Sequence, residues 1–373
     1  MDLSELQLKL LPDEIICGKC PVRIDLAGSW TDLSPYCNIQ RGSIINMAVD
    51  LNNQPPIHVY IKRNSNFIIR IHCINNGLTE TIRNYNDLEN YKSSTSLFSI
   101  VKAALILTGL FDSKACFEEC LKNLGTGFQI TLFSAVSVGT GIGTTSIIAA
   151  TLLGALSILC RLNWDNLMIC KKAVILEQML EINAGWQNQY GGVLNGIKFL
   201  EVESLNNEYP IVKWLPDHLF VLPEYKSCQL LYYTGIQRTD NRNFEVSSKI
   251  NEGTDEVSDL LESIKENTYG LFKAIQVCDY DRVGLSINKT RTLNSLIDNR
   301  IIPNYLLSLF NKIDDYCIGY KMLGSGYSYM YMMAKDIKAV NHIKSVLLTT
   351  PINSNARFID FSLSTTGLSI CKI

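Results

Sequence analysis

The sequence predicts an α+β fold with two domains. Strand-like runs dominate the first part of the chain, and helices and strands alternate irregularly after Pro223. The length of 373 residues also exceeds what one hydrophobic core usually fills. Because no repeat or low-complexity linker separates the two parts, we expect a tight boundary, with a first domain over residues 1–215 and a second over 216–373.

Apolar patterning predicts the elements of the first part in order. Alternating or continuous apolar runs indicate strands at 22–27, 57–62, 67–74 and 128–136. Apolar residues at helical spacing indicate helices at 97–107 and 146–160, the second too short to span a bilayer. A further helix is expected after Asp165, which can cap it, and to continue through Asn183.

The second part repeats this mixture of elements. We expect strands at 228–234, 329–334 and 357–363, helices within 255–312, and a helix near 336–348. This mixed order is typical of α+β domains rather than of a regular alternation of parallel strands and helices.

The charge balance argues against nucleic-acid or membrane binding. The chain has 34 basic and 36 acidic residues, a net charge of −2 and a hydrophobic share of 47 %, values that are ordinary for a soluble globular protein. The first residues, MDLSELQLKLLPDEII, lack the basic start and apolar core of an export signal. We therefore expect a cytoplasmic protein without a nucleic-acid or membrane partner, and the sequence indicates no particular oligomeric state.

The twelve cysteines are expected to be reduced thiols rather than a disulfide framework. Cys17 and Cys20 form a CxxC, but no second pair follows at matching spacing and the histidines are scattered. A zinc or redox site is one interpretation. Two small residues beside a buried strand is the favoured one.

A glycine-rich turn, VGTGIGTTSIIAA at 138–150, stands between a predicted strand and a predicted helix. Gly139, Gly141 and Gly143 let the backbone approach an anion, and the helix N-terminus offers free N–H groups. Thr144 and Thr145 can present hydroxyls to a metal-bound phosphate. The segment is neither a Walker loop nor a dinucleotide fingerprint, so phosphate binding and a plain tight turn both stay open.

Glu177 lies on the apolar side of its predicted helix. A carboxylate that faces a core needs a partner. Mg²⁺ is one candidate, and an Arg or Lys side chain is equally compatible with the pattern.

The segment CPVRIDLAGSWTDLSPY at 20–36 combines a strand with a polar turn. Arg23 and Asp25 are two apart and therefore share one face of the strand. The turn then brings Trp30, Thr31 and Asp32, an apolar platform beside hydroxyl acceptors, which is typical of a sugar site. The alternative is a surface Arg–Asp pair beside a buried Trp.

The segment AGWQNQYGG at 184–192 packs polar and aromatic residues between glycines. Such a composition usually lines a site, yet it contains no acid, base or nucleophile. The pattern alone leaves its role undecided.

Six segments in order resemble the GHMP family of small-molecule kinases, and within it fucokinases and heptose-7-phosphate kinases. The resemblance runs nearly end to end. The segments are PVRIDLAGSWTD, GTGIGTTSIIAATLLGAL, LEQMLEINAGWQNQYGG, LLYYTGIQRT, GYKMLGSGYSYMYMMAKD and ARFIDFSLSTTGL.

The resemblance implies a two-domain kinase, with an S5-like N-terminal domain, a ferredoxin-like C-terminal domain, and ATP and Mg²⁺ bound between them. Thr145 and Glu177 take the places of the family's metal ligands. Arg23 is implied to neutralise charge at the transferring phosphate. The residues implied in nucleotide binding are Gly139, Thr140, Gly141, Gly143, Thr144, Gly324, Ser325 and Gly326.

The resemblance also implies a sugar site. Trp30, Thr31, Asp32 and Gln187 would hold the sugar. The family's catalytic aspartate lies eleven residues past its metal-binding glutamate, and this position is Asn188 here.

Three positions depart from the family pattern. Ser29 replaces a usual glycine, which is a small change, and GSGYSY from Gly324 places side chains where the family has bare glycine backbone. Asn188 lacks the carboxylate that would accept the proton of the attacking hydroxyl, a contribution of about 10² to 10⁴ in rate. Phosphoryl transfer depends mainly on placement and charge neutralisation, however, so this change is compatible with slow turnover as well as with none.

Two hypotheses follow from the sequence. In the first, the protein is an ATP-dependent sugar kinase that phosphorylates the anomeric hydroxyl of fucose or a related sugar, with Asn188 orienting the sugar. In the second, it is a catalytically impaired or silent relative that binds a sugar or regulates a partner. The intact glycine-rich turn and Glu177 favour the first hypothesis, and Asn188 and the altered third motif favour the second.

Overall fold

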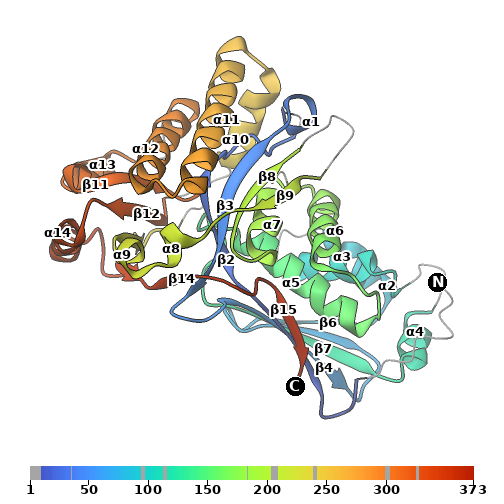
Figure 1. Cartoon of the computed structure of the whole chain (residues 1–373). Helices are drawn as coiled ribbons and strands as arrows, with labels where there is room; N and C mark the ends of the chain where they lie inside the picture. Colours follow the sequence, from blue (N-terminus) through green and yellow to red (C-terminus); the bar gives the residue numbers. More distant parts are fainter. Residues whose placement is uncertain are drawn as a thin grey trace.

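The computed structural model describes residues 10–34, 36–93, 97–111, 116–182, 184–202, 209–237, 242–298, 303–324 and 327–373. Figure 1 shows three sheets with helices packed between and around them. One group of helices lies beside the N-terminal sheets, and another covers the sheet formed by later parts of the chain.

The first sheet has six strands. They are β1 Ile15–Cys20, β4 Ile57–Asn64, β5 Ile69–Cys73, β6 Thr79–Ile82, β7 Gly127–Ser134 and β15 Ser369–Lys372. Their spatial order is β15-β1-β4-β7-β5-β6, and neighbours are antiparallel except for β5 and β7, which are parallel.

The second sheet passes through the middle of the molecule, where β2 and β3 stand upright in Figure 1. Its strands are β2 Val22–Ala27, β3 Ser43–Leu51, β8 Ile197–Glu201, β9 Ile211–Trp214 and β14 Phe361–Leu363. The long strand β3 pairs with β2, β14 and β8 along its length, so it connects the elements that carry the polar segments singled out above.

The third sheet is formed late in the chain. Its strands are β10 Gln229–Tyr233, β11 Cys317–Met322, β12 Tyr329–Ala334 and β13 Arg357–Ile359, in the antiparallel order β11-β12-β10-β13. A separate hydrophobic cluster surrounds this sheet and includes Trp30, Leu33 and Tyr36 from the segment after β2. The turn after β2 therefore reaches from the first part of the molecule into the second core.

The helices fall into two groups. Those of the first part are α1 Tyr36–Gln40, α2 Tyr85–Glu89, α3 Leu97–Leu107, α4 Phe117–Asn123, α5 Thr144–Leu159, α6 Asn166–Met179 and α7 Gln187–Val193, with a 3-10 turn at Asn90–Ser93. The later ones are α8 His218–Val221, α9 Pro223–Lys226, α10 Arg242–Glu252, α11 Asp255–Gln276, α12 Tyr280–Ile297, α13 Asn304–Phe310 and α14 Ile337–Thr349, with a 3-10 turn at Asp314–Tyr316.

The helix α5 is the central support of the first part. It is buried along nearly its whole length and contacts β1 and β4 on one side and α6 and α7 on the other. Its sequence, TTSIIAATLLGALSIL, explains this position, because a helix that is apolar all round has to be enclosed.

Several predicted elements are confirmed. The helix at 97–107 and the strand at 329–334 have the expected bounds. The side chain of Asp165 caps α6 by accepting from the Met168 N–H at 2.7 Å, as expected. The helix ends at Met179, however, earlier than predicted, and Asn183 lies outside the described residues.

The predicted strand at 357–363 is two strands, which corrects the expectation. β13 pairs with β10 in the third sheet, whereas β14 pairs with β3 in the second. Asp360 lies between them and its carbonyl accepts from the Asn52 N–H at 2.9 Å. The chain then continues to β15, so its last strands lie in the sheets formed mainly by the first part (Figure 1). The domain boundary near residue 215 stays a prediction.

The CxxC is part of a buried strand. Cys17 and Cys20 both lie in β1, where side chains three apart point to opposite faces, so the two thiols cannot share one metal ion. Within the described residues, no group of three His, Cys, Asp or Glu side chains is arranged to hold a metal.

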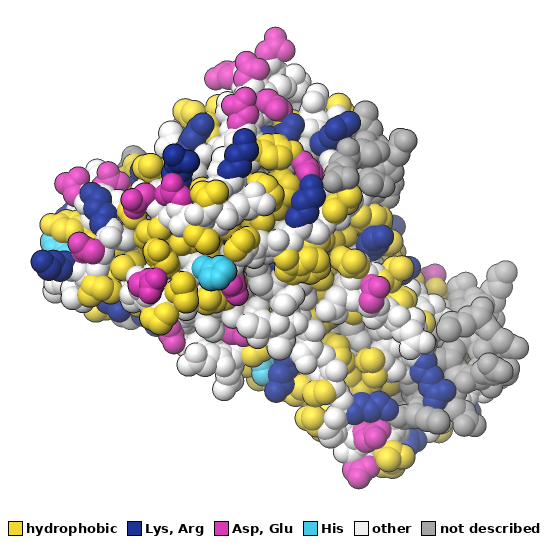
Figure 2. All heavy atoms as spheres, in the orientation of Figure 1, with side chains coloured by type: hydrophobic (Ala, Val, Ile, Leu, Met, Phe, Trp, Pro, Cys, Tyr) yellow, Lys and Arg dark blue, Asp and Glu magenta, His cyan; other side chains and the backbone are white. Residues whose placement is uncertain are grey.

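The visible surface carries interspersed charges of both signs. On the face shown in Figure 2, Lys and Arg side chains alternate with Asp and Glu, and hydrophobic side chains gather in the centre. Among the helices that the structure describes, none is both long enough and apolar enough to cross a membrane.

Candidate active site

Arg23 lies at the centre of the candidate site. It is buried on β2, and its guanidinium contacts three separate parts of the chain. Nε and Nη2 donate to Oδ1 of Asn188 at 3.0 and 2.8 Å, and Nη1 donates to Oδ1 of Asp25 at 2.7 Å and to the Gly141 carbonyl at 3.2 Å. One side chain therefore joins the first motif, the glycine-rich turn and the AGWQNQYGG segment.

Most of the AGWQNQYGG segment is helical, because α7 covers Gln187–Val193. α7 begins at Gln187, so Asn188 stands in its first turn. At the other end, Nζ of the buried Lys198 donates to the carbonyls of Gly191, Leu194 and Gly196 at 3.2, 2.8 and 2.9 Å. Burial lowers the pKa of Lys198 to about 7, and its N–H groups satisfy carbonyls at the C-terminal end of the helix.

Asp25 binds two cations and thereby connects the first motif to the third sheet. Its carboxylate accepts from Arg23, from Lys321 on β11, from the Ser29 hydroxyl at 2.7 Å and from the Gly324 N–H at 3.1 Å. Burial alone would raise the pKa of Asp25, but Lys321 and Arg23 outweigh it and hold this pKa well below its usual range. The Arg–Asp pair is thus buried, not on the surface.

Asp32 is buried without a cation at ion-pair distance among the described residues. Its two oxygens accept from the Gln187 N–H and the Gln187 side-chain amide, both at 3.2 Å. Burial raises the pKa of this carboxyl to about 6, and the Gln187 N–H and Arg23 offset part of that rise.

Trp30 has the unusual backbone of this turn. Its φ is +81°, in a region of backbone conformation that residues other than glycine rarely adopt. Thr31 helps to hold the turn, because its hydroxyl donates to the carbonyls of Gly28 at 2.8 Å and Ser43 at 3.0 Å. Thr31 was expected to contact the sugar. The structure instead turns its fully buried side chain into the protein, so it supports the turn.

The glycine-rich turn has the backbone that its sequence indicates. Gly139, Gly141 and Gly143 have φ values of +81°, +83° and +80°, and Gly143 precedes the 16-residue helix α5 without a side-chain cap. The first N–H groups of α5 are therefore available to an anion. The hydroxyls of Thr140 and Thr144 donate to the Ser137 carbonyl at 2.8 and 3.3 Å, so these hydroxyls hold the turn while its backbone stays available.

The third motif touches this turn directly. A Cβ added to Gly141 would stand 2.1 Å from the Leu323 carbonyl oxygen, and one added to Gly324 would stand 2.6 Å from the Gly141 carbonyl oxygen. Only glycine permits that approach at both positions. Ser325 and Gly326 lie outside the described residues.

Glu177 points from α6 into the protein, as predicted. It accepts from the Ser146 hydroxyl and from the side-chain amide of Gln189, and no described Lys or Arg pairs with it. Burial raises the pKa of this carboxyl to about 7, and the two hydrogen bonds lower it in part. The sequence patterns did not indicate Ser146 or Gln189 as site residues. The residue of α5 that contacts Glu177 is Ser146, not Thr145.

Most of the predicted substrate residues meet at one pocket. It has a volume of about 50 Å³ and is lined by Arg23, Ser29, Trp30, Asp32, Leu33, Ala184, Gly185, Gln187, Asn188 and Gly324. Two buried polar atoms of the lining, Trp30 Nε1 and Gln187 Oε1, have no hydrogen-bond partner within the described part of the chain. A donor and an acceptor left free in one pocket suit a ligand with several hydroxyl groups.

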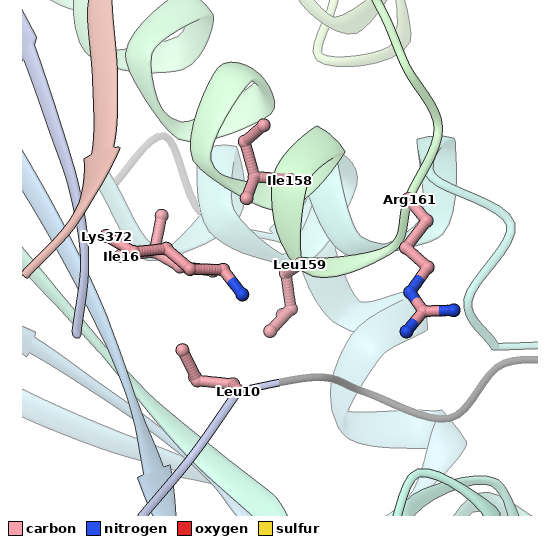
Figure 3. Close-up of a pocket in the computed structure, with 6 residues that line it drawn as sticks. All are labelled: Leu10, Ile16, Ile158, Leu159, Arg161 and Lys372. Atoms are coloured by element: carbon pink, nitrogen blue, oxygen red, sulfur yellow. The ribbon is translucent and has the colours of Figure 1, made fainter. Parts of the chain in front are cut away.

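A larger cavity lies elsewhere and contains none of the predicted site residues. It has a volume of about 370 Å³ and is lined by Leu10, Ile16, Ile158, Leu159, Arg161 and Lys372 (Figure 3). It is at the C-terminal end of α5, roughly 24 Å along the helix from the glycine-rich turn. The chemistry is therefore assigned to the smaller pocket.

The fold is that of the GHMP kinases, and several comparisons with known proteins point to the same family. Residues 111–196 match the family model of the GHMP kinases N terminal domain. The solved structure of a D-glycero-D-manno-heptose 1-phosphate kinase from Bacteroides thetaiotaomicron has a TM-score of 0.71 at 18 % identity, covering 96 % of this chain and 99 % of that one. A galactokinase of Lactococcus lactis in complex with galactose has a TM-score of 0.69 at 14 % identity, covering 97 % and 96 %.

The chain is similar to GHMP kinases along nearly its whole length, and the expected α+β fold is confirmed. It is 40 % identical to the L-fucokinase/L-fucose-1-P guanylyltransferase of Bacteroides fragilis over 98 % of its own length, but it spans only 39 % of that protein. It is 25 % identical to the D-glycero-alpha-D-manno-heptose 7-phosphate kinase of Campylobacter jejuni, over 87 % of this chain and 91 % of that one.

Proposed function

We propose that the protein is a sugar kinase that transfers the γ-phosphate of ATP to the anomeric hydroxyl of fucose or a related sugar. The observation that carries the proposal is the position of Arg23. Its guanidinium contacts both the Gly141 carbonyl of the glycine-rich turn and Asn188 of the pocket, so one cation faces the two places where phosphate and sugar would meet. Charge neutralisation at that point is the largest contribution to phosphoryl transfer.

The glycine-rich turn fits the nucleotide phosphates. Three positive-φ glycines precede an uncapped helix N-terminus, and Gly324 packs against Gly141 from the other side. In this proposal Gly139 to Thr144 and Gly324 bind the phosphates through their backbone.

The surroundings of Glu177 fit a divalent cation. This carboxylate has no described cationic partner, and Oε1 of the adjacent Gln189 is buried without a hydrogen-bond partner in the described residues. Oxygen ligands of this kind suit Mg²⁺. We assign Glu177 to the metal, with Thr145 as a second ligand on the strength of the sequence resemblance, although the hydroxyl that contacts Glu177 in the structure is that of Ser146. A bound metal would neutralise phosphate charge.

The side chains that line the pocket suit a sugar, but the pocket is too small to hold one as it stands. Trp30 supplies an apolar face, and Asp32, Gln187 and Asn188 supply polar groups. Its volume of about 50 Å³ is far below the roughly 300 Å³ or more of typical ligand sites. Sugar binding in this proposal therefore requires the pocket to widen.

A catalytically silent sugar-binding protein is the alternative. Asn188 favours it, because its amide oxygen already accepts from Arg23 and its remaining NH₂ group can only donate. The same contact also supports the kinase, since Asn188 holds Arg23 in place as a carboxylate would.

The test is ADP release from Mg·ATP with fucose and a panel of related sugars, run on the wild type and on Asn188→Asp. Turnover by the wild type on any sugar supports the kinase and excludes the silent alternative. Activity in Asn188→Asp alone would show an intact site without a working base. If neither protein turns over or gains thermal stability with nucleotide, the kinase proposal is wrong.

A further inference from the structure

Among the described residues that line the pocket, one side chain can accept a proton from a sugar hydroxyl. Of its lining residues, Arg23 is a permanent cation, and the Ser29 hydroxyl donates to Asp25 at 2.7 Å. Gln187 and Asn188 are neutral amides, and the others are apolar or glycine. The carboxylate of Asp32 is the remaining candidate, and it stands in the same small pocket as Asn188, where the family has its catalytic aspartate.

The surroundings of Asp32 leave its carboxylate able to accept a proton. Its two oxygens each accept one N–H from Gln187 at 3.2 Å, which leaves further lone pairs on both oxygens. A Cβ added to Gly185 would stand 1.8 Å from Oδ2 of Asp32, so glycine at 185 is what allows the carboxylate to lie against the backbone. Asp25 cannot take this role, because two cations, a hydroxyl and an N–H occupy its oxygens.

The electrostatic surroundings of Asp32 suit proton transfer near neutral pH. Burial raises its pKa to about 6, while Arg23 lowers it and Asp25 raises it from β2. Cys37 faces it from α1, and burial raises the pKa of that thiol to about 12, so it is neutral. A base with a pKa just below the working pH is mostly deprotonated and still binds a proton well.

We propose that Asp32 is the general base of this kinase, in place of the carboxylate that is absent at Asn188. The inference rests on the proposed sugar kinase function. The sugar oxygen forms its bond to the γ-phosphorus while its O–H bond breaks and the proton moves to a carboxylate oxygen of Asp32. The bond from the γ-phosphorus to the β,γ-bridging oxygen breaks, ADP leaves with that electron pair, and Asp32 later releases the proton to water.

The experiment is a double-mutant cycle on positions 32 and 188, with kcat and KM measured on the sugar that the wild type uses. Asp32→Asn is expected to lower kcat by about 10²-fold or more, the contribution of a positioned base. Adding Asn188→Asp to Asp32→Asn is expected to restore kcat at least about tenfold, because a carboxylate returns to the same pocket. If Asp32 only holds the sugar, Asp32→Asn would raise KM, and adding Asn188→Asp would not restore kcat.

The single variant Asn188→Asp keeps the test valid even if Asp32→Asn fails to fold. Where Asp32 already serves as base, a second carboxylate raises kcat by less than about tenfold; a rise of about 10² or more would show that the wild type lacks a base. Asp50→Asn is the control, because Asp50 is a half-buried carboxyl whose pKa is also raised by burial and which does not line the pocket. Its kcat is expected to equal that of the wild type.

The outcomes separate this inference from the function on which it rests. If the wild type is active and Asp32→Asn keeps its kcat with a raised KM, Asp32 binds sugar only and the inference is wrong, while the kinase proposal stands. If neither the wild type nor Asn188→Asp shows turnover with any sugar, both are wrong, and activity in Asn188→Asp alone contradicts the inference on Asp32 only. Loss of kcat in Asp32→Asn with rescue by the second substitution supports both.

Discussion

Asp25 lies in β2 and Asp32 in the turn that follows this strand, and both are buried, with exposed fractions of 0 % and 2 %. Their partners differ. Asp25 accepts from Arg23, Lys321, Ser29 and Gly324, whereas Asp32 accepts from the backbone and side chain of Gln187 and has no cation at ion-pair distance among the described residues. The same burial therefore leaves one carboxyl strongly acidic and raises the pKa of the other to about 6.

The difference in partners gives the two carboxyl groups of the first motif different properties. A carboxylate with two cations is fixed in its ionised form and holds structure, here by joining β2 to β11 and to the third motif. A carboxylate with two weak donors can gain and lose a proton. Environments that push two carboxyl pKa values apart are how active sites divide structural and acid–base roles.

The largest expected effect follows from removing the second cation of Asp25. Lys321→Met leaves a buried charge with one cation fewer, which costs about 3 to 5 kcal/mol in the free energy of unfolding. The measurement is urea denaturation monitored by circular dichroism. Lys213→Met is the control, because it breaks the pair of Lys213 with Glu201, 3.3 Å apart and more exposed, and should cost about 0 to 1 kcal/mol. Equal losses in the two variants would show that Lys321 does not hold Asp25.

A smaller effect is expected from displacing Asp32 without removing it. Gly185→Ala places a Cβ where Oδ2 of Asp32 lies and should lower kcat/KM by about 10²-fold, as a shift of about 1 Å in a catalytic group does. Gly270→Ala is the matched control. A Cβ there meets nothing within 4 Å on helix α11, so kcat/KM should stay unchanged and the protein should gain about 0.5 to 1 kcal/mol of stability. Full activity in Gly185→Ala would contradict the placement of Asp32.

Local patterns in the sequence predict which residues are buried or share a face, but not the residues that they contact. Apolar spacing and the Asp165 cap indicate α3 and α6, and the apolar side of α6 indicates that Glu177 is buried. The two-residue spacing of Arg23 and Asp25 places them on one face of a strand. Each of these inferences uses neighbours within a few turns or a few strand residues, where sequence distance and spatial distance agree.

The partners of these residues are distant in sequence and could not be predicted in this way. Lys321 reaches Asp25 across 296 residues, and Gln187 reaches Asp32 across 155. The helix α7 could not be predicted from local sequence either, because its two glycines give it weak helix propensity. It is held instead by Arg23 at its first turn and by Lys198 at its end, contacts that only the folded chain provides.

The smallest expected effect is a pH dependence that belongs to Asp32 alone. A raised pKa means that the folded state binds the proton more tightly than the unfolded chain, whose Asp pKa is about 3.9. The stability contributed by protonated Asp32 is therefore complete below about pH 4 and is lost as the pH rises through about 6. The free energy of unfolding of Asp32→Asn minus that of the wild type should thus increase by about 2 kcal/mol between pH 4.5 and 7.5. Urea denaturation of both proteins at the two pH values measures this difference. A difference that does not change with pH would show that Asp32 is ionised throughout and paired as Asp25 is.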